Sequence, residues 1–274
     1  MTACARDVND DVDIAAIPLQ LWSGSVALAR YLLDEQGSLF NENQNPQTGR
    51  IHIVELGGGV GLCSVVAMRI LLSSSKPTKS SSCSTSTACS RVTCTDRSAA
   101  AVSLAAVNLR KNSEVDDASS IDLFAKQFDF SGGKRAVEEF FTNILGRPQS
   151  NQKPNKIHDK KDDNQETILL LGADLLYERE STLDLISFIT ELQEAISIVT
   201  EQAEHPYAHH GKIRVTIRLS YEERVCFSKA TLREEVTEVP LFLEAMENEG
   251  INYSCIKAAT RNQDKNMKIL CIEL

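Results

Sequence analysis

The sequence lacks any long uninterrupted run of apolar residues. No stretch of about 20 consecutive apolar residues is present, so a transmembrane helix and a membrane partner are not expected. The first residues are polar and charged, among them Arg6, Asp7 and Asp11, and they do not form the apolar core of a secretory signal. We therefore expect a soluble, cytoplasmic protein, with the nucleus as a further compartment.

The sequence also lacks an excess of positive charge. Its 38 acidic residues outnumber the 29 lysines and arginines, which gives a formal net charge of -9. Such a surface repels the phosphate backbone of nucleic acids, so no nucleic-acid partner is expected. The same balance suits a small-molecule ligand together with a basic segment of a protein partner.

The chain contains eight cysteines, but their positions favour neither disulfides nor a metal site. Four fall in predicted helices or strands and are expected to be free buried thiols, namely Cys63, Cys94, Cys255 and Cys271. The C-x-x-C spacing of a zinc site is missing around Cys83, Cys89 and Cys94. A further group of potential ligands, His205, His209 and His210, lies in a polar connecting stretch. Metal binding is therefore not predicted at either place.

Residues 51–62 are the most informative segment, because an apolar strand ending in Glu55 runs directly into a glycine-rich turn. Glycine occupies positions 57, 58, 59 and 61. Glycine is needed where the backbone takes a positive φ or where no Cβ can be tolerated beside a ligand. The next segment, 62–72, has helical apolar spacing. Strand, turn and helix together predict a nucleotide-type site in an α/β sheet.

The glycine spacing excludes two common phosphate-binding loops. A dinucleotide fingerprint needs glycine at its first, third and sixth positions, but the sixth position is Leu62 counted from Gly57 and Ser64 counted from Gly59. A P-loop would end in Gly-Lys-Ser/Thr, which is absent from this turn. What remains is an acidic residue followed by glycine at three alternate positions. A glycine-rich turn of another Rossmann-like protein is the alternative.

A second acidic residue, Asp96, ends the strand predicted over 92–95. A carboxylate at the end of the second strand can hold a ribose diol through two hydrogen bonds. The usual gap after the glycine turn is about 20 residues. The gap is longer here because of the segment 76–90, which is rich in Ser and Thr and almost free of large apolar side chains. We interpret 76–90 as a disordered insertion outside the sheet.

Predicted strands and helices alternate from residue 51 onward, as in a single α/β domain that spans residues 1–274. An amphipathic helix over 21–33, with Ser23 as an N-cap, precedes this series. Further helices are predicted over 98–112, 134–145, 181–200 and 239–250, and further strands over 121–128, 167–173, 212–219, 251–256 and 267–274. The last two strands can pair antiparallel. The mixed-charge segment 147–166 is a second predicted disordered insertion.

The strand predicted over 167–173 is almost entirely apolar, as expected of a central parallel strand buried on both faces. It ends in Asp174, which is followed by two leucines and Tyr177. Ligands of open parallel sheets bind at the carboxyl ends of the strands, so Asp174 and Tyr177 are expected beside the glycine turn. The alternative is that Asp174 caps the next helix and Tyr177 only packs.

These features together resemble the seven-strand S-adenosylmethionine-dependent methyltransferases, in the branch of lysine methyltransferases that modify non-histone proteins. The resemblance rests on Leu21-Trp22-Ser23 ahead of a helix, the turn from Glu55 to Gly61, Thr95-Asp96, Asn108 and Asn112, and the D-x-x-Y ending at 174–177. It covers nearly all of the chain outside the two insertions. It implies a Rossmann-like, seven-stranded, mostly parallel sheet with helices on both faces and an antiparallel last strand.

The resemblance also implies a binding site for S-adenosyl-L-methionine. It assigns the cofactor to Trp22, Glu55, Gly57, Gly59, Gly61, Asp96, Asp129 and Ala173. Glu55 and the glycines would border the methionine part, Asp96 would hold the ribose, Asp129 would contact the adenine and Trp22 would close over the pocket. Phe130 stands where the family usually has tryptophan. Without the resemblance, Trp22 is equally well explained as an anchor of the hydrophobic core.

Methyl transfer to an amine needs little chemistry from the protein. A sulfonium methyl is already activated, so catalysis is mainly in-line placement of an amine lone pair together with removal of the ammonium proton. The pKa of free lysine is about 10.4, so the site must favour the neutral amine or pass its proton to water. By the resemblance, Asp174 and Tyr177 are the catalytic residues. Asp174 would accept a hydrogen bond from the amine, and Tyr177 would position the lysine chain.

The sequence therefore predicts a monomeric protein-lysine N-methyltransferase that acts on a non-histone protein substrate with a target lysine. The alternatives are a catalytically idle cofactor-binding assembly factor, or a methyltransferase acting on histidine or a small molecule. Base methylation is not expected, because the enzymes that carry it out resemble one another in an Asn/Asp-Pro-Pro-aromatic motif where this chain has Leu175 and Leu176. The substrate itself is not encoded in these motifs, since recognition lies in variable loops.

Overall fold

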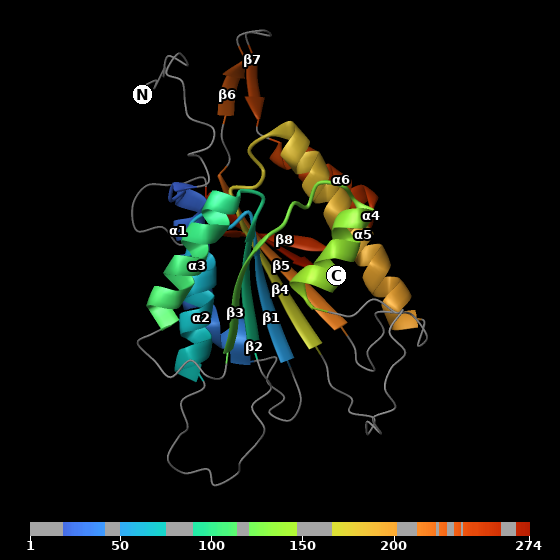
Figure 1. The fold of residues 1–274 in the computed structure, drawn as a ribbon. Helices are drawn as coiled ribbons and strands as arrows, with labels where there is room; N and C mark the ends of the chain where they lie inside the picture. The colour runs from blue at the N-terminus through green and yellow to red at the C-terminus, as the bar shows by residue number, and fades with distance from the viewer. Residues whose placement is uncertain are drawn as a thin grey trace.

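The computed structural model describes residues 19–41, 50–74, 90–113, 121–146, 166–201, 213–222, 225–228, 233–236, 238–258 and 267–274. In these ranges a seven-stranded sheet is covered by helices on both faces (Figure 1). No helix among them is long and apolar enough to cross a membrane. The two predicted insertions lie outside the described residues, apart from their last residues, Ser90 and Glu166, which begin strands.

The sheet has the strand order β3-β2-β1-β4-β5-β9-β8. Its parallel part consists of β1 (Arg50–Leu56), β2 (Ser90–Asp96), β3 (Ile121–Gln127), β4 (Glu166–Ala173) and β5 (Ile213–Glu222). The last strand, β9 (Met267–Glu273), runs antiparallel between β5 and β8 (Tyr253–Lys257). The predicted fold class is therefore confirmed.

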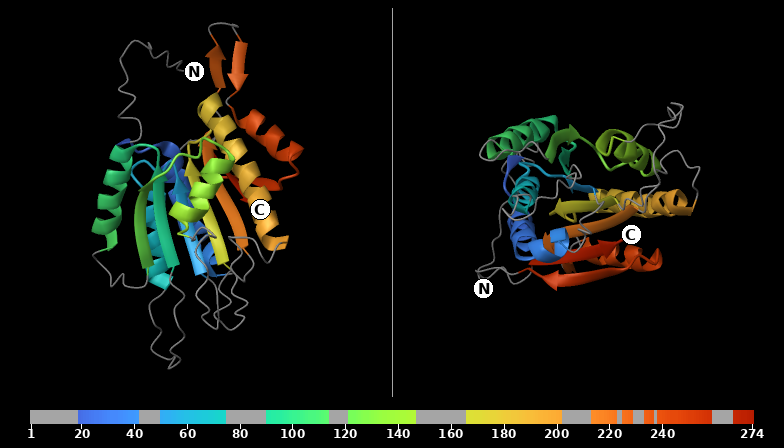
Figure 2. Two further views of the ribbon diagram at one scale, coloured as in Figure 1. Left: turned by 45° about the vertical axis from the view of Figure 1, so that its right-hand side comes forward. Right: turned by 90° about the horizontal axis from the view of Figure 1, so that it is seen from below.

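Helices form two layers, one on each side of the sheet (Figure 2). One layer contains α1 (Ser23–Asp34), the π-helical turn η2 (Gly37–Asn41), α2 (Leu62–Ser74) and α3 (Ala99–Ser113). The other contains α4 (Lys134–Glu139), the π-helical turn η3 (Phe140–Ile144), α5 (Arg179–Glu201) and α6 (Val239–Asn248). Successive strand residues face opposite layers, so Ile53 belongs to the α2 core while Val54 and Leu56 belong to the α5 core.

Helix α1 precedes the first strand in the sequence but packs over the middle of the sheet, against β4, β5 and β9. It begins at Ser23, and the N-cap position is held by Trp22 in an extended conformation. Among the described residues, the Trp22 side chain makes no capping hydrogen bond. The prediction that Ser23 is the N-cap is therefore wrong by one residue. A side chain distant in the sequence, Asp174, accepts a hydrogen bond from the first turn of this helix.

Three further features differ from the sequence-based expectations. A hairpin of β6 (Val225–Ser228) and β7 (Arg233–Val236) follows the carboxyl end of β5 and projects from the sheet (Figure 1). Its strands of four residues are too short to show a clear alternation. The helix predicted over 134–145 turns into η3 after α4. Of the expected buried thiols, Cys63, Cys94 and Cys271 are buried, but Cys255 is exposed because it lies on the edge strand β8.

Candidate active site

The turn after β1 has the backbone that its glycines predict. Gly57, Gly59 and Gly61 have φ angles of 57°, 53° and 79°. Residues with a Cβ rarely adopt this left-handed region, so glycine is required at these positions. The turn is tied to the end of β2, because the Gly58 N–H donates to the carbonyl oxygen of Thr95 at 2.8 Å.

Asp96 is the last residue of β2 and lies directly beside the glycine turn. Its Oδ2 accepts a hydrogen bond from the Gly59 N–H at 2.9 Å, and its Oδ1 accepts one from the Ser98 N–H at 2.8 Å. A carboxylate has about four acceptor directions, so two further donors can bind to the same group. A ribose diol supplies two such donors. The structure thus places Asp96 beside the glycine turn, and its predicted role in holding a ribose stays a prediction.

Glu55 lies behind the turn, fully buried. Its Oε2 accepts a hydrogen bond from the Ser64 N–H at 2.8 Å, so the carboxyl group caps the first turn of α2. Burial raises the pKa of Glu55 above its usual 4.5, and hydrogen bonds from Ser64 and Cys63 offset only part of this rise. Glu55 thus fixes the helix that follows the turn. Its predicted place beside the methionine part of a cofactor stays a prediction.

The turn is supported on two further sides. The Asn108 side chain, on α3, donates its Nδ2–H to the carbonyl oxygen of Val60 at 2.8 Å. The thiol of Cys94, on β2, lies so close that its sulfur would be 2.5 Å from a Cβ placed on Gly58. A side chain at position 58 would therefore collide with the sheet. Asn108 and Gly58 therefore both maintain the shape of the turn, which explains why these two residue types occur at these positions.

Asp174 follows β4 in an unusual conformation. Its φ of 53° makes it the one residue other than glycine with a positive φ in the described part of the chain. Its Oδ2 accepts a hydrogen bond from the Gly24 N–H at 2.8 Å, and its own N–H donates to the carbonyl oxygen of Ser220 at 3.0 Å. Gly24 lies in the first turn of α1. Asp174 therefore does cap a helix, but that helix is α1, 150 residues away in the sequence.

Ser220, on β5, completes this contact. Its hydroxyl donates to the carbonyl oxygen of Gly24 at 2.8 Å, so Gly24 is held by β4 through its N–H and by β5 through its carbonyl. A Cβ on Gly24 would lie 2.4 Å from Oδ2 of Asp174, so a larger residue would force this carboxylate to move. Neither residue was predicted from the sequence. The signal that could have found Gly24 is a small residue directly after Trp22-Ser23.

Two aromatic side chains remain exposed close to this contact. Trp22 precedes Gly24 by two residues and is 36% exposed, and Tyr177 follows Asp174 by three residues and is 52% exposed. The alternative that Trp22 is an anchor of the core is therefore wrong. Leu175 and Leu176, between Asp174 and Tyr177, are buried instead. The D-x-x-Y segment thus turns its leucines inward and leaves Tyr177 toward solvent.

The remaining predicted site residues lie at the same edge of the sheet. The Phe128 N–H donates to the carbonyl oxygen of Asp96 at 3.0 Å, which brings the end of β3 next to β2. Asp129 follows and is exposed, with its Oδ1 accepting the Ser131 N–H at 2.9 Å. Phe130 packs against Phe188 of α5, with ring centroids 6.5 Å apart. Ala173 ends β4, where its ladder partner is Ser220.

Metal ligands do not gather in the described residues, where no group of three or more His, Cys, Asp or Glu side chains could hold an ion. Five of the residues considered as ligands from the sequence lie outside the described part, namely Cys83, Cys89, His205, His209 and His210.

The amino-terminal part of the chain is similar to a known family. Residues 7–124 match a family model described as lysine methyltransferase. The matched part includes α1, the glycine turn, Asp96 and Asn108. Over these residues the chain is similar to that family. The left-handed glycine turn with Asp96 beside it fits S-adenosylmethionine as a ligand.

Solved methyltransferase structures show distant likeness. The methyltransferase domain of a bacterial Hen1 protein has 13% identity and a TM-score of 0.39, over 88% of this chain and 100% of that one. A methyltransferase from Aquifex aeolicus has 12% identity and a TM-score of 0.38, over 92% and 93%. TYW2 of M. jannaschii, in complex with AdoMet, has 9% identity and a TM-score of 0.37, over 93% and 77%. No curated protein sequence matches the chain.

Proposed function

We propose that this protein is an S-adenosylmethionine-dependent methyltransferase, and that it transfers the methyl group to a lysine side chain of a non-histone protein. The observation that carries the proposal is the position of Asp174, a carboxylate held at the carboxyl end of β4 by Gly24, with the exposed Tyr177 three residues further on. The description of the matching family, lysine methyltransferase, supports the same substrate class. That match includes α1, whose first turn makes the contact with Asp174.

In this proposal, the cofactor binds at the carboxyl ends of the four strands β1, β2, β3 and β4. Asp96 accepts hydrogen bonds from the ribose hydroxyls, and the left-handed glycines let the backbone approach the methionine part. Asp129 lies at the end of β3 beside Asp96, where an adenine ring bonded to the same ribose would extend. Ala173 borders the methionine part from β4. Trp22, half-exposed at the start of α1, closes the site on the side of Asp174.

Bound S-adenosylmethionine supplies an already activated methyl group. Asp174 accepts a hydrogen bond from the incoming amine and so aims the nitrogen lone pair at the methyl carbon. The new C–N bond forms as the C–S bond breaks, and the amine proton passes to water. Because the pKa of free lysine is about 10.4, the amine must give up a proton before transfer. Tyr177, with its ring in solvent, flanks the aliphatic part of the lysine.

The surface around Asp174 suits a protein substrate. Large apolar side chains that remain exposed there include Leu21, Trp22 and Tyr177, and Leu183 of α5 is also exposed. The β6–β7 hairpin leaves the sheet at the same edge, where β5 ends (Figure 1). With a formal net charge of -9, the protein attracts a basic segment around the target lysine.

A second function competes with this one. The hydrogen bond to Gly24 gives Asp174 a structural reason for its position, so the same residue suits a cofactor-binding assembly factor without catalysis. The decisive experiment is incubation of the protein with labelled S-adenosylmethionine and a cell lysate, followed by identification of the labelled molecule and residue. Label on a protein lysine supports the proposal. Label on histidine or a small molecule, or tight cofactor binding without any labelled product, contradicts it.

A further inference from the structure

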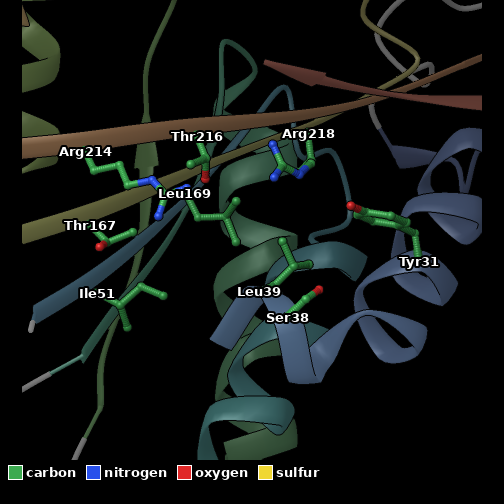
Figure 3. A pocket seen from close by; sticks show the side chains of 9 residues that line it. All are labelled: Tyr31, Ser38, Leu39, Ile51, Thr167, Leu169, Arg214, Thr216 and Arg218. Carbon is green, nitrogen blue, oxygen red and sulfur yellow. The ribbon is translucent and has the colours of Figure 1, made fainter. Parts of the chain in front are cut away.

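One face of the central strand β5 is polar where an apolar face is expected. Strands in the middle of a mostly parallel sheet are normally apolar on both sides. On β5, the side chains that face away from the α5 core are Arg214, Thr216, Arg218 and Ser220. Ser220 is explained by its hydrogen bond to Gly24. The other three line a cavity of about 130 Å³ (Figure 3).

This cavity is separate from the methyl-transfer site. It lies between the end of the α1–η2 segment and the amino-terminal halves of β1 and β4, and Thr167 in its wall is the second residue of β4. Asp174 follows the last residue of the same strand. The wall residue nearest to Asp174 is Arg218, whose ladder partner Leu171 precedes Asp174 by three residues, which corresponds to about 10 Å. A ligand in the cavity therefore does not occupy the cofactor site.

The charged side chains that line the cavity are two arginines, Arg214 and Arg218. Glu273 pairs with Arg218, Nη2 to Oε1 at 3.0 Å, and with Arg214, Nη2 to Oε2 at 3.4 Å. One carboxylate is thus shared by two guanidinium groups, both of which reach toward the same space (Figure 3). None of the described residues that line the cavity is acidic.

Hydrogen-bond donors also gather in the wall. The Nε of Arg218 is buried and has no hydrogen-bond partner among the described residues. A buried donor without an acceptor is costly, so this N–H favours an acceptor brought from outside. Burial and the neighbouring Cys271 raise the pKa of Tyr31 to about 12, which keeps its phenol protonated at neutral pH. Thr167 and Thr216 add two hydroxyl groups.

We propose that this cavity binds a small tetrahedral oxyanion of the phosphate type. Arg214 and Arg218 lie four residues apart on one face of β5, and guanidinium groups match phosphate oxygens in geometry and charge. A cavity of about 130 Å³ has room for a small anion. Of the two arginines, Arg218 is the more buried, with its side chain 11% exposed.

The test is isothermal titration calorimetry with inorganic phosphate at constant ionic strength. We compare the unmodified protein with Arg214→Gln, Thr216→Val and Arg179→Gln. Arg179 is the matched control, because its substitution also removes one guanidinium and one ion pair to a glutamate, at 3.7 Å from Glu238 on the opposite helical layer. Arg214 is half-exposed, so its substitution leaves the fold intact.

We expect one saturable phosphate site, weakened about tenfold or more in Arg214→Gln, weakened less in Thr216→Val and unchanged in Arg179→Gln. Saturating S-adenosylhomocysteine is expected to leave phosphate binding unchanged, because the two sites lie apart. Three results would overturn the proposal. These are no saturable binding, equal weakening in Arg179→Gln, and displacement of phosphate by S-adenosylhomocysteine. Acetate serves as a second probe, and tighter binding of acetate than of phosphate would also contradict the assigned anion class.

Discussion

The carboxylate of Asp174 accepts the backbone N–H of Gly24 at 2.8 Å and thereby joins the end of β4 to the first turn of α1. The residue proposed to orient the substrate amine is the same residue that holds the helix carrying Trp22 at its N-cap. Two functions, the placement of the amine and the closure of the cofactor site, therefore depend on one carboxyl group. A substitution of Asp174 has to separate them.

Asp174→Asn distinguishes the placement of the amine from the attachment of α1. Asparagine keeps an oxygen that can accept the Gly24 N–H and tolerates the left-handed φ, but it lacks the negative charge. We expect methyl transfer to fall by about 10²- to 10⁴-fold while cofactor affinity stays within a few-fold. Asp174→Ala is expected to lose the same activity and also stability, because it cannot cap α1. Near-normal transfer by Asp174→Asn, measured on the identified substrate, would leave Asp174 with a structural role only.

Gly24→Ala tests the contact from the other side. Alanine normally stabilises a helix by up to about 1 kcal/mol relative to glycine. Here the new Cβ would lie 2.4 Å from Oδ2 of Asp174, so we expect the free energy of unfolding to fall by about 1–3 kcal/mol. Gly37→Ala is the matched control, because no atom lies within 4 Å of its Cβ position. Urea unfolding of both variants gives the comparison, and a stabilised Gly24→Ala would refute the tight fit.

Ser220→Ala should weaken the attachment of α1 to the sheet, although Ser220 is not a proposed cofactor ligand. It removes the buried hydrogen bond to the Gly24 carbonyl, which is worth about 1 kcal/mol. Trp22 is the chain's single tryptophan, so its fluorescence reports on the start of α1 alone. Compared with the unmodified protein, we expect Ser220→Ala to show a smaller fluorescence change on addition of S-adenosylhomocysteine and to bind this ligand a few-fold more weakly. Ser103→Ala, which removes an exposed hydroxyl bond within α3, should behave like the unmodified protein.

Asp96→Ala tests whether Asp96 binds the ribose of the cofactor. Loss of its charge-assisted hydrogen bonds is expected to weaken S-adenosylmethionine binding by about 1–3 kcal/mol in calorimetry. Because Asp96 also accepts the Gly59 and Ser98 N–H groups, Asp96→Asn is the companion variant that retains an acceptor oxygen. The unmodified protein should bind S-adenosylhomocysteine and show no comparable response to NAD. Binding of NAD with equal affinity would exclude the cofactor assignment.

Glu55→Gln should change how stability depends on pH. Burial raises the folded-state pKa of Glu55 above 4.5, so the folded protein binds a proton that the unfolded chain releases. Stability from this group is fully present below pH 4.5 and is lost as the pH rises through the folded pKa. Relative to Glu55→Gln, the free energy of unfolding should fall by up to about 1.4 kcal/mol per pH unit in that window. The free energy of unfolding is measured with urea at several pH values. If it depends on pH in the same way in both proteins, the raised pKa of Glu55 is contradicted.

The sequence predicted those features that depend on short segments. The alternate glycines at 57, 59 and 61 require a left-handed turn, and the apolar run of β4 indicates a central strand, so both were found. The contact of Asp174 with Gly24 joins residues 150 positions apart, and local pattern carries no information about it. The polar face of β5 is likewise typical of a half-exposed strand, because alternation shows which residues share a face but not what covers that face.

The placement of α1 has a consequence for how the protein is made. This helix leaves the ribosome before any strand of the sheet, yet Tyr31 meets Cys271 at 3.7 Å across 240 positions of sequence, and Gly24 meets Ser220 across 196. Contacts between such distant parts of a chain form late, because a long loop must close first. Helix α2 can cover part of α1 early, but the side of α1 that packs on β5 and β9 must stay uncovered until the end of the chain is made. The unfinished chain is the form most exposed to aggregation and most dependent on chaperones.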